Sequence, residues 1–256
     1  MNILEQILAV KRKEVETAKY TLPLRAIERL IAHRNDFRPF MAALKGPTLR
    51  LIAEIKRASP SRGELIRNFD HRKLAREYES FGARALSVLT DREFFKGSLD
   101  HLKDVRRETS LPILRKDFII DEYQLYESVL YGADAVLLIV AALDHASFRT
   151  LYRAARELGL SVLVETTKRE EIDSANEIDA EIIGVNNRDL TTFNVLLERS
   201  LELRSAIRPG AVAVSESGMR SKDDLLKMKE AKYDAVLVGE GLRSPQLRSV
   251  VAGEVV

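Results

Sequence analysis

Short apolar runs rich in β-branched residues alternate along the chain with longer amphipathic segments. Such runs are typical of buried parallel strands, whereas apolar residues at three-to-four spacing indicate helices. The runs that fit the strand pattern are Leu51–Lys56, Ala85–Thr90, Pro112–Lys116, Ala135–Val140, Ser161–Glu165, Ile182–Asn186, Val212–Ser215 and Ala235–Gly239. These strand–helix units predict an α/β fold, a closed (β/α)8 TIM barrel.

Helices are predicted between the strands, and several are followed by a glycine. Glycine readily adopts the left-handed conformation that ends many helices, and Gly82, Gly132 and Gly159 stand where such a cap belongs. The alternative is an open, doubly wound sheet, but no Gly-x-Gly-x-x-Gly follows the first strand, which weakens its dinucleotide-binding version. The clearest helical segments are His71–Phe81, Leu99–Glu108, Glu122–Tyr131, His145–Leu158 and Ser221–Lys229.

Residues 1–48 precede the first strand and have a helical pattern. Apolar residues recur at three-to-four spacing, but the segment has too little apolar content to be stable alone. We therefore expect a single domain over residues 1–256, in which residues 1–48 pack on a barrel formed by residues 49–256. The residues of this pattern are Ile3, Leu4, Ile7, Leu8, Leu24, Ile27, Leu30 and Ile31.

The composition limits the classes of partner. With 41 Lys+Arg and 39 Asp+Glu the net charge is +2, which gives no overall field for nucleic acid or a membrane surface. The basic run Val10–Lys13 could bind nucleic acid, but a solvated helix face is the favoured interpretation. No cysteine is present, no apolar run spans a bilayer, and the first ten residues lack the layout of a signal peptide. We expect a soluble, cytoplasmic protein.

Polar residues close most of the predicted strands. Glu54 and Lys56 are two residues apart, so they share one face of the first strand. Alone, this pair could be a surface ion pair on an edge strand, but its recurrence at other strand ends favours a convergent site, because barrel enzymes gather their chemistry there. Asp91, Asp117 and Asp189 are interpreted as solvated loop charges. The residues that close the other strands are Lys116, Glu165, Asn186, Arg188, Glu216, Ser217 and Gly239.

This set suits proton transfer and phosphate binding. Neighbouring lysines have depressed pKa values when desolvated, and a glutamate in an apolar pocket has a raised one, so Lys116, Lys56, Glu54 and Glu165 are candidate acids and bases. Ser215–Gly218 and Val238–Gly241 end the last two strands. Each alone could be a glycine turn, but together they stand where this architecture binds phosphate.

The chain resembles the indole-3-glycerol-phosphate synthase family of tryptophan biosynthesis over nearly its whole length. The separated motifs follow in the family's order, which is more specific than any one of them. They are Ile52–Arg57 with Ser59-Pro60-Ser61, Ser87–Asp91 with Phe95 and Gly97-Ser98, Leu114–Ile119, Val164-Glu165, Gly184–Leu190, Ser215–Gly218 and Val238-Gly239.

The resemblance implies an enzyme, a carboxy-lyase, that closes 1-(2-carboxyphenylamino)-1-deoxyribulose 5-phosphate into an indole ring with loss of carbon dioxide and water. By position, Lys116 resembles the general acid and Glu165 the base. Glu54 resembles a partner in the dehydration, and Lys56 faces the substrate carboxylate or donates a proton. Asn186, Glu216 and Ser217 complete the catalytic set, the first two as orienting groups.

The resemblance also implies the binding residues. Ser59, Ser217, Gly218, Gly239 and Glu240 correspond to phosphate positions. Many family members have serine where this chain has Glu240, and a carboxylate repels phosphate, so we expect only the Glu240 backbone N–H to contribute. An apolar wall around the anthranilate ring and a group near the carboxylate end complete the set: Phe95, Phe118, Leu137 and Leu190 for the wall and Arg188 for the carboxylate end.

No metal or organic cofactor is expected. The histidines, His33, His71, His101 and His145, form no ligand-spaced pair in the sequence. The expected partner is a phosphorylated small molecule, not nucleic acid or a membrane; a monomer is expected, and association with other tryptophan-pathway enzymes is left open. The alternatives are a Schiff-base aldolase that uses Lys116 or Lys56, a phosphate-binding isomerase, and a binding protein without turnover.

Overall fold

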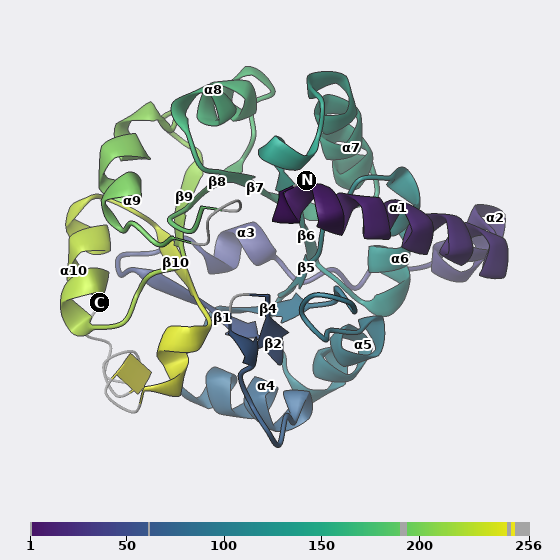
Figure 1. Cartoon of the computed structure of the whole chain (residues 1–256), viewed down its shortest axis with the longest axis horizontal. Coiled ribbons are helices and arrows are strands. Elements are labelled where there is room, and N and C mark those ends of the chain that lie inside the picture. Colours follow the sequence, from purple (N-terminus) through teal and green to yellow (C-terminus); the bar gives the residue numbers. More distant parts are fainter. Residues whose placement is uncertain (1, 61, 190–193, 245–246, 249–256) are drawn as a thin grey trace.

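The strands of the computed structural model form one closed parallel barrel (Figure 1), and the structure describes residues 2–60, 62–189, 194–244 and 247–248. The strand order around the barrel is β1-β10-β9-β8-β7-β6-β5-β4. The predicted barrel is confirmed, the open sheet is excluded, and each predicted strand end lies within one residue of the observed one. The strands are β1 (Arg50–Ile55), β4 (Ala85–Leu89), β5 (Ile113–Lys116), β6 (Ala135–Ile139), β7 (Ser161–Thr166), β8 (Ile182–Asn186), β9 (Val212–Glu216) and β10 (Ala235–Val238).

Helices surround the barrel, and short polar side chains begin many of them. Asp70, Ser98, Asp121, Asp144 and Ser221 each accept a backbone N–H of the first turn of the following helix, which satisfies a donor that the helix itself cannot pair. The helices are α4 (His71–Ser80), α5 (Leu99–Glu108), α6 (Glu122–Tyr131), α7 (His145–Glu157), α8 (Arg169–Glu177), α9 (Glu198–Leu203) and α10 (Lys222–Glu230), with 3₁₀ turns η1 (Val140–Ala142), η2 (Arg204–Ala206) and η3 (Glu240–Arg243).

The predicted glycine caps are confirmed. Gly82, Gly132 and Gly159 have φ values of 88°, 95° and 84°, the left-handed region in which a side chain is strained. Helices α8 and α9 were not among the segments predicted from the sequence. A short hairpin of β2 (Ala58–Ser59) and β3 (Gly63–Glu64) after β1 was also not predicted, because two-residue strands give no hydrophobic pattern.

Alternation along the strands places a polar layer directly above an apolar one. Ile52, Leu114, Leu163, Val214 and Leu237 are buried together in the cluster that fills the barrel. Side chains two residues apart on a strand share a face, so the residue two positions after each of these also points into the barrel, nearer its C-terminal end. Four of those residues are charged or polar, Glu54, Lys116, Glu165 and Glu216, and the fifth is Gly239, which has no side chain.

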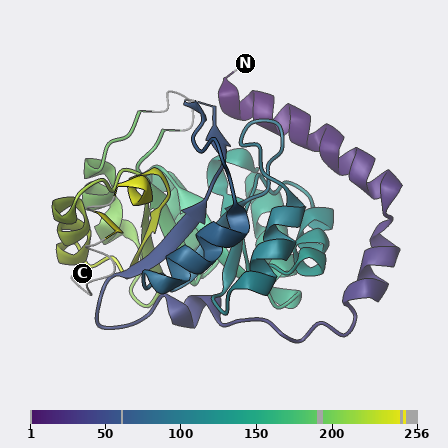
Figure 2. The ribbon, with the colours of Figure 1, turned by 90° about the horizontal axis from the view of Figure 1, so that it is seen from below.

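The N-terminal extension forms α1 (Ile3–Thr21), α2 (Leu24–Ile31) and α3 (Phe40–Ala43). In Figure 2, α1 and α3 lie at opposite ends of the barrel. Leu4, Ile7 and Leu8 of α1 belong to the same buried cluster as the barrel interior, as does Phe40 of α3. These residues of the extension therefore pack against the barrel. Among the described residues, no helix has the length and apolar character that a membrane span requires.

Two sequence interpretations are wrong at α1. Lys11, expected on a solvated face, is only 3% exposed, and its Nζ lies 3.1 Å from Asp91 Oδ2 and 2.9 Å from Asp117 Oδ1. Asp91 and Asp117, expected in solvent, are buried as well. The ion pairs join residues far apart in the sequence, at the ends of β4 and β5, so local patterns could not reveal them.

This cluster is strongly coupled electrostatically. Burial disfavours the charged form of Lys11, but Asp117 and Asp91 more than offset it and raise its pKa above the ordinary value. Burial likewise disfavours ionised Asp117, yet Lys11 and Arg115 hold the pKa of that carboxyl well below its usual range. Because these pairs fix α1 to two strand ends, we propose that the extension and barrel fold as one domain.

Replacing Lys11 tests this attachment. Lys11→Ala leaves two buried carboxylates without their ammonium partner, so we expect a loss of about 3–5 kcal/mol in the free energy of unfolding, measured by urea denaturation. The control is Lys13→Ala, which removes an exposed lysine of the same helix and should change stability by about 0.5 kcal/mol or less. Equal stability of the two variants would contradict a structural role for Lys11.

Candidate functional site

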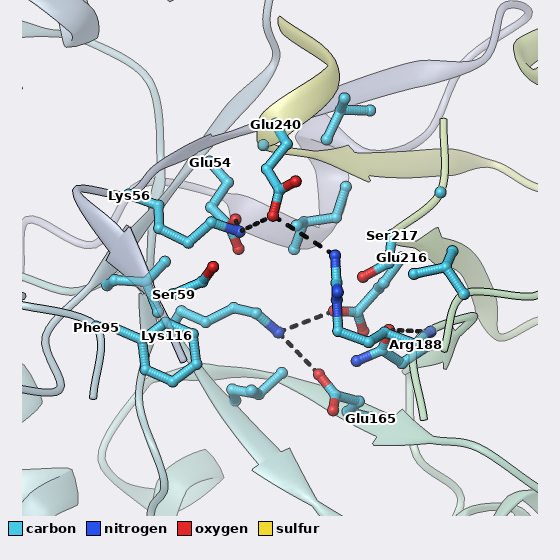
Figure 3. Close-up of a pocket in the computed structure, with 18 of the residues that line it drawn as sticks. Glu54, Lys56, Ser59, Phe95, Lys116, Glu165, Arg188, Glu216, Ser217 and Glu240 are labelled. Atoms are coloured by element: carbon cyan, nitrogen blue, oxygen red, sulfur yellow. Dashed lines mark hydrogen bonds and ion pairs between the residues drawn. The ribbon is translucent and has the colours of Figure 1, made fainter. Parts of the chain in front are cut away.

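One pocket opens at the C-terminal end of the barrel, and it brings together nearly all the predicted site residues (Figure 3). Leu190 lies outside the described residues, and every other predicted residue lines the pocket. They are Glu54, Lys56, Ser59, Phe95, Lys116, Phe118, Leu137, Glu165, Asn186, Arg188, Glu216, Ser217, Gly218, Gly239 and Glu240.

Lys116, the last residue of β5, lies between two carboxylates. Its Nζ is 2.8 Å from Glu165 Oε2 on β7 and 3.0 Å from Glu216 Oε2 on β9. Burial alone would lower the pKa of Lys116, but Glu165, Glu216 and Glu54 raise it above the ordinary value. The predicted depression of this pKa is wrong, because carboxylates rather than lysines surround the ammonium. Lys116 is therefore a fully protonated donor.

Glu216 differs from its neighbours because it favours the neutral form. The side chain is completely buried, and burial raises its pKa to about 8 although Lys116 opposes the shift. Coulombic repulsion and a hydrogen bond with Glu165 reinforce the shift. Glu216 needs space that Gly184 provides: a Cβ at Gly184 would lie 2.3 Å from Glu216 Oε1. Near neutral pH the pocket thus contains a protonated carboxyl beside a protonated lysine.

Glu54 and Lys56 form an ion pair at the end of β1, with Lys56 Nζ 2.5 Å from Glu54 Oε1. Burial disfavours ionised Glu54, but Lys56 and Lys116 more than compensate and lower its pKa. The predicted rise of this pKa is wrong, since the pocket is charged and not apolar at this position. Glu54 packs closely against Gly239, since a Cβ at Gly239 would lie 2.3 Å from Glu54 Oε1.

A buried asparagine holds the turn after β9. Asn187 Nδ2 donates to Ser215 Oγ at 3.1 Å and to the carbonyl oxygens of Glu216 and Ser217 at 3.0 Å each. The turn needs support, because Ser217 has φ 65° and Gly218 has φ 95°. Sequence reasoning did not assign Asn187 to the site. The sequence did contain a signal for this role. Asn187 directly follows Asn186, and because successive side chains of a strand point to opposite faces, Asn187 points away from the barrel axis that Asn186 faces.

Aromatic side chains form one wall of the pocket. The rings of Phe95 and Phe118 are tilted, with centroids 6.2 Å apart. Asp91 Oδ1 accepts the backbone N–H of Phe95 at 3.1 Å, and Asp117 Oδ1 accepts that of Phe118 at 2.8 Å. The carboxylates that bind Lys11 therefore also fix the loops that carry both rings. Leu137 lines the pocket and also packs in the barrel core.

Basic residues converge on the side chain of Glu240, at the start of η3. Glu240 Oε2 lies 3.1 Å from Arg62 Nη1, and Oε1 lies 3.5 Å from Arg188 Nη2 and 4.0 Å from Lys56 Nζ. The sequence indicated only a backbone role for Glu240 and no role for Arg62. Within the described part of the chain, no three His, Asp or Glu side chains are placed to hold a metal ion.

Comparison with known proteins gives close relatives. The family model described as indole-3-glycerol phosphate synthase matches residues 4–251. An indole-3-glycerol phosphate synthase of Chlorobium limicola is 49% identical over 253 residues, 98% of each chain. That of Pelodictyon phaeoclathratiforme is 51% identical over 250 residues, 96% of this chain and 98% of the relative.

Solved structures of other enzymes share the fold. N-acetylmannosamine-6-phosphate 2-epimerase from Clostridium perfringens matches with a TM-score of 0.63 at 13% identity, covering 88% of this chain and 99% of its own. Thiamine phosphate pyrophosphorylase from Pyrococcus furiosus matches with a TM-score of 0.59 at 17% identity, covering 80% of this chain and 92% of its own. These likenesses concern the barrel alone.

The raised pKa of Glu216 predicts a pH-dependent stability. The folded chain keeps a proton on Glu216 up to about pH 8, whereas an unperturbed glutamate releases it near 4.5, so this group's contribution to stability is lost as pH rises between these values. Glu216→Gln should therefore lose less unfolding free energy than the wild type between pH 5 and pH 8, by on the order of 1 kcal/mol or more in urea denaturation. Glu202→Gln, at an exposed position of α9, is the control and should follow the wild type. Identical pH dependence of all three proteins would refute the assignment.

Proposed function

The chain belongs to the indole-3-glycerol phosphate synthase family, and from this membership we propose a role for each residue of the pocket. The protein closes the indole ring of 1-(2-carboxyphenylamino)-1-deoxyribulose 5-phosphate, with loss of carbon dioxide and water. Its substrate is a phosphorylated small molecule.

Lys116 is the proposed general acid. In ring closure the aromatic carbon that bears the carboxylate attacks the ketone carbon, and the ketone oxygen takes up a proton. The raised pKa of Lys116 supports this role, and the hydrogen bonds that its Nζ donates to Glu165 and Glu216 fix the direction of the ammonium. Neutral Glu216 avoids a second full negative charge beside the developing hydroxyl.

Carbon dioxide then leaves and its electron pair remains in the ring system. Dehydration follows, in which a base removes a proton and the former ketone oxygen departs as water. Glu165 is the proposed base, and Glu54 is its partner in this step. The lowered pKa of Glu54 keeps this carboxylate ionised, so it can accept a proton or a hydrogen bond. Asn186 orients the substrate from the adjacent strand.

Different groups of residues are proposed to bind the carboxylate, the aromatic ring and the phosphate of the substrate. Lys56 and Arg188 face the carboxylate, and the aromatic ring lies against Phe95, Phe118 and Leu137. The backbone around Ser217, Gly218, Gly239 and Glu240 takes the phosphate, together with Ser59. Ser59 Oγ supports this placement because it is buried and has no hydrogen-bond partner among the described residues.

The contacts of Lys116 with two buried carboxylates carry the proposal, and replacing Lys116 tests it. Lys116→Ala and the longer Lys116→Met should lower turnover roughly 10²–10⁴-fold, since a general acid contributes about this much. Indole-3-glycerol phosphate formation is measured by fluorescence. The dissociation constant of a phosphate-bearing inhibitor should stay within a few-fold of the wild-type value. The control is Lys103→Ala, which removes an exposed lysine of α5. Retained turnover in both Lys116 variants would exclude the acid role.

A Schiff base would use the same lysine differently. Lys116 or Lys56 as a nucleophile would form an imine with the substrate ketone, which borohydride would reduce to a stable adduct. We expect no adduct by mass spectrometry after borohydride treatment with substrate, because an ammonium between two carboxylates is a poor nucleophile. A stoichiometric adduct would replace the acid role with covalent catalysis.

We propose further that the enzyme acts as a monomer in the cytoplasm. In support of this proposal, the exposed large apolar side chains of the described residues are few, and they come from α1, α2, α9 and the loop before α9. Sedimentation equilibrium should give a mass near 28.9 kDa. A stable dimer mass at micromolar concentration would overturn this proposal.

A further inference from the structure

Glu240 joins three cations that come from different parts of the chain. Lys56 follows β1, Arg62 lies in the β2–β3 turn, Arg188 follows β8, and Glu240 begins η3. The Glu240 side chain is 18% exposed and reaches across the pocket toward Lys56 and Arg188 (Figure 3). Glu54 also pairs with Lys56, at 2.5 Å, but among the described residues Glu240 is the acidic group within 4.0 Å of both cations proposed to receive the substrate's carboxylate.

The two oxygens of Glu240 are held differently. Oε2 lies 3.1 Å from Arg62 Nη1, within direct ion-pair distance. Oε1 is buried and lies 3.5 Å from Arg188 and 4.0 Å from Lys56, and it has no hydrogen-bond partner in the described part of the chain. A buried carboxylate oxygen without a hydrogen bond is costly, so attraction between charges alone holds Oε1 here. An anion of better geometry can displace it.

We infer that the Glu240 carboxylate is an internal stand-in for the carboxylate of the substrate: it neutralises Lys56 and Arg188 until the substrate's carboxylate takes its place. This inference rests on the proposed binding of the carboxylate by Lys56 and Arg188. Two carboxylates repel one another between the same cations, so Glu240 must give way. Arg62, whose side chain is 54% exposed, offers it a partner nearer the solvent.

The exchange has a consequence for the end of the reaction. Decarboxylation breaks the bond between the ring and the carboxyl carbon. The electron pair of that bond stays in the ring system and neutral carbon dioxide leaves, so no carboxylate remains beside Lys56 and Arg188. The indole product keeps its phosphate but has no carboxylate. Glu240 can then return to Lys56 and Arg188, which distinguishes the product from the substrate at this end of the pocket.

Two unreactive ligands and Glu240→Gln test the inference. The first ligand is the substrate with its ketone reduced to an alcohol, and the second is the same molecule without the ring carboxylate. Both carry the phosphate, so the ratio of their dissociation constants isolates the carboxylate. Titration calorimetry should show that Glu240→Gln increases the preference for the carboxylate ligand about fivefold, equivalent to a coupling free energy of about 1 kcal/mol.

Controls separate the outcomes. Glu64→Gln removes an exposed carboxylate from the β2–β3 hairpin that carries Arg62. Glu64 pairs with Arg57 at 3.1 Å, and its replacement should leave the ratio of the two dissociation constants unchanged. If Glu240→Gln changes both affinities equally, or reduces the preference, Glu240 is no stand-in and the inference is overturned. Lys56→Met should reduce the preference for the carboxylate ligand. If it does not, the proposed carboxylate placement is wrong, and the inference fails with it for that separate reason.

Discussion

In a closed parallel barrel, every second side chain of each strand points toward the barrel axis, and this constraint produces the site. The inward positions are apolar up to Leu114 and Leu163, and the next inward positions are Lys116 and Glu165. The apolar layer excludes water below, so the polar layer above it is buried on one side and open on the other. Charges placed there interact strongly, and their electrostatics follow from the fold.

Opposite charges alternate within this polar layer, which is why burial does not neutralise most of it. Lys116 lies between two carboxylates and Glu54 lies beside Lys56, so each charged group stabilises its neighbour against desolvation. Glu216 shares the single ammonium with Glu165 and is therefore the group that keeps a proton. A similar arrangement beneath α1, in which Lys11 bridges Asp91 and Asp117, supports the loops of the aromatic wall.

Sequence reasoning recovered what local patterns encode. The eight strands follow from hydrophobic runs, and the converging residues follow from their places at strand ends. It failed where partners are distant in the chain: Lys11 looked solvent-exposed because its carboxylates lie on β4 and β5, and the pKa directions of Lys116 and Glu54 depended on which charges meet across the barrel. Asn187 was missed because its role is to hold a turn and not to face the pocket.

The fold alone would not have identified the chemistry, since two enzymes with other names share the barrel at 17% identity or less. The glycines beneath the carboxylates show what a transplant of this site would require. The side chains of Glu216 and Glu54 occupy the volume where Gly184 and Gly239 lack a Cβ. If only the charged residues were copied onto another barrel, these carboxylates would clash with the side chains that stand where this chain has Gly184 and Gly239. The polar layer could be transferred to another barrel only together with the glycines on the neighbouring strands.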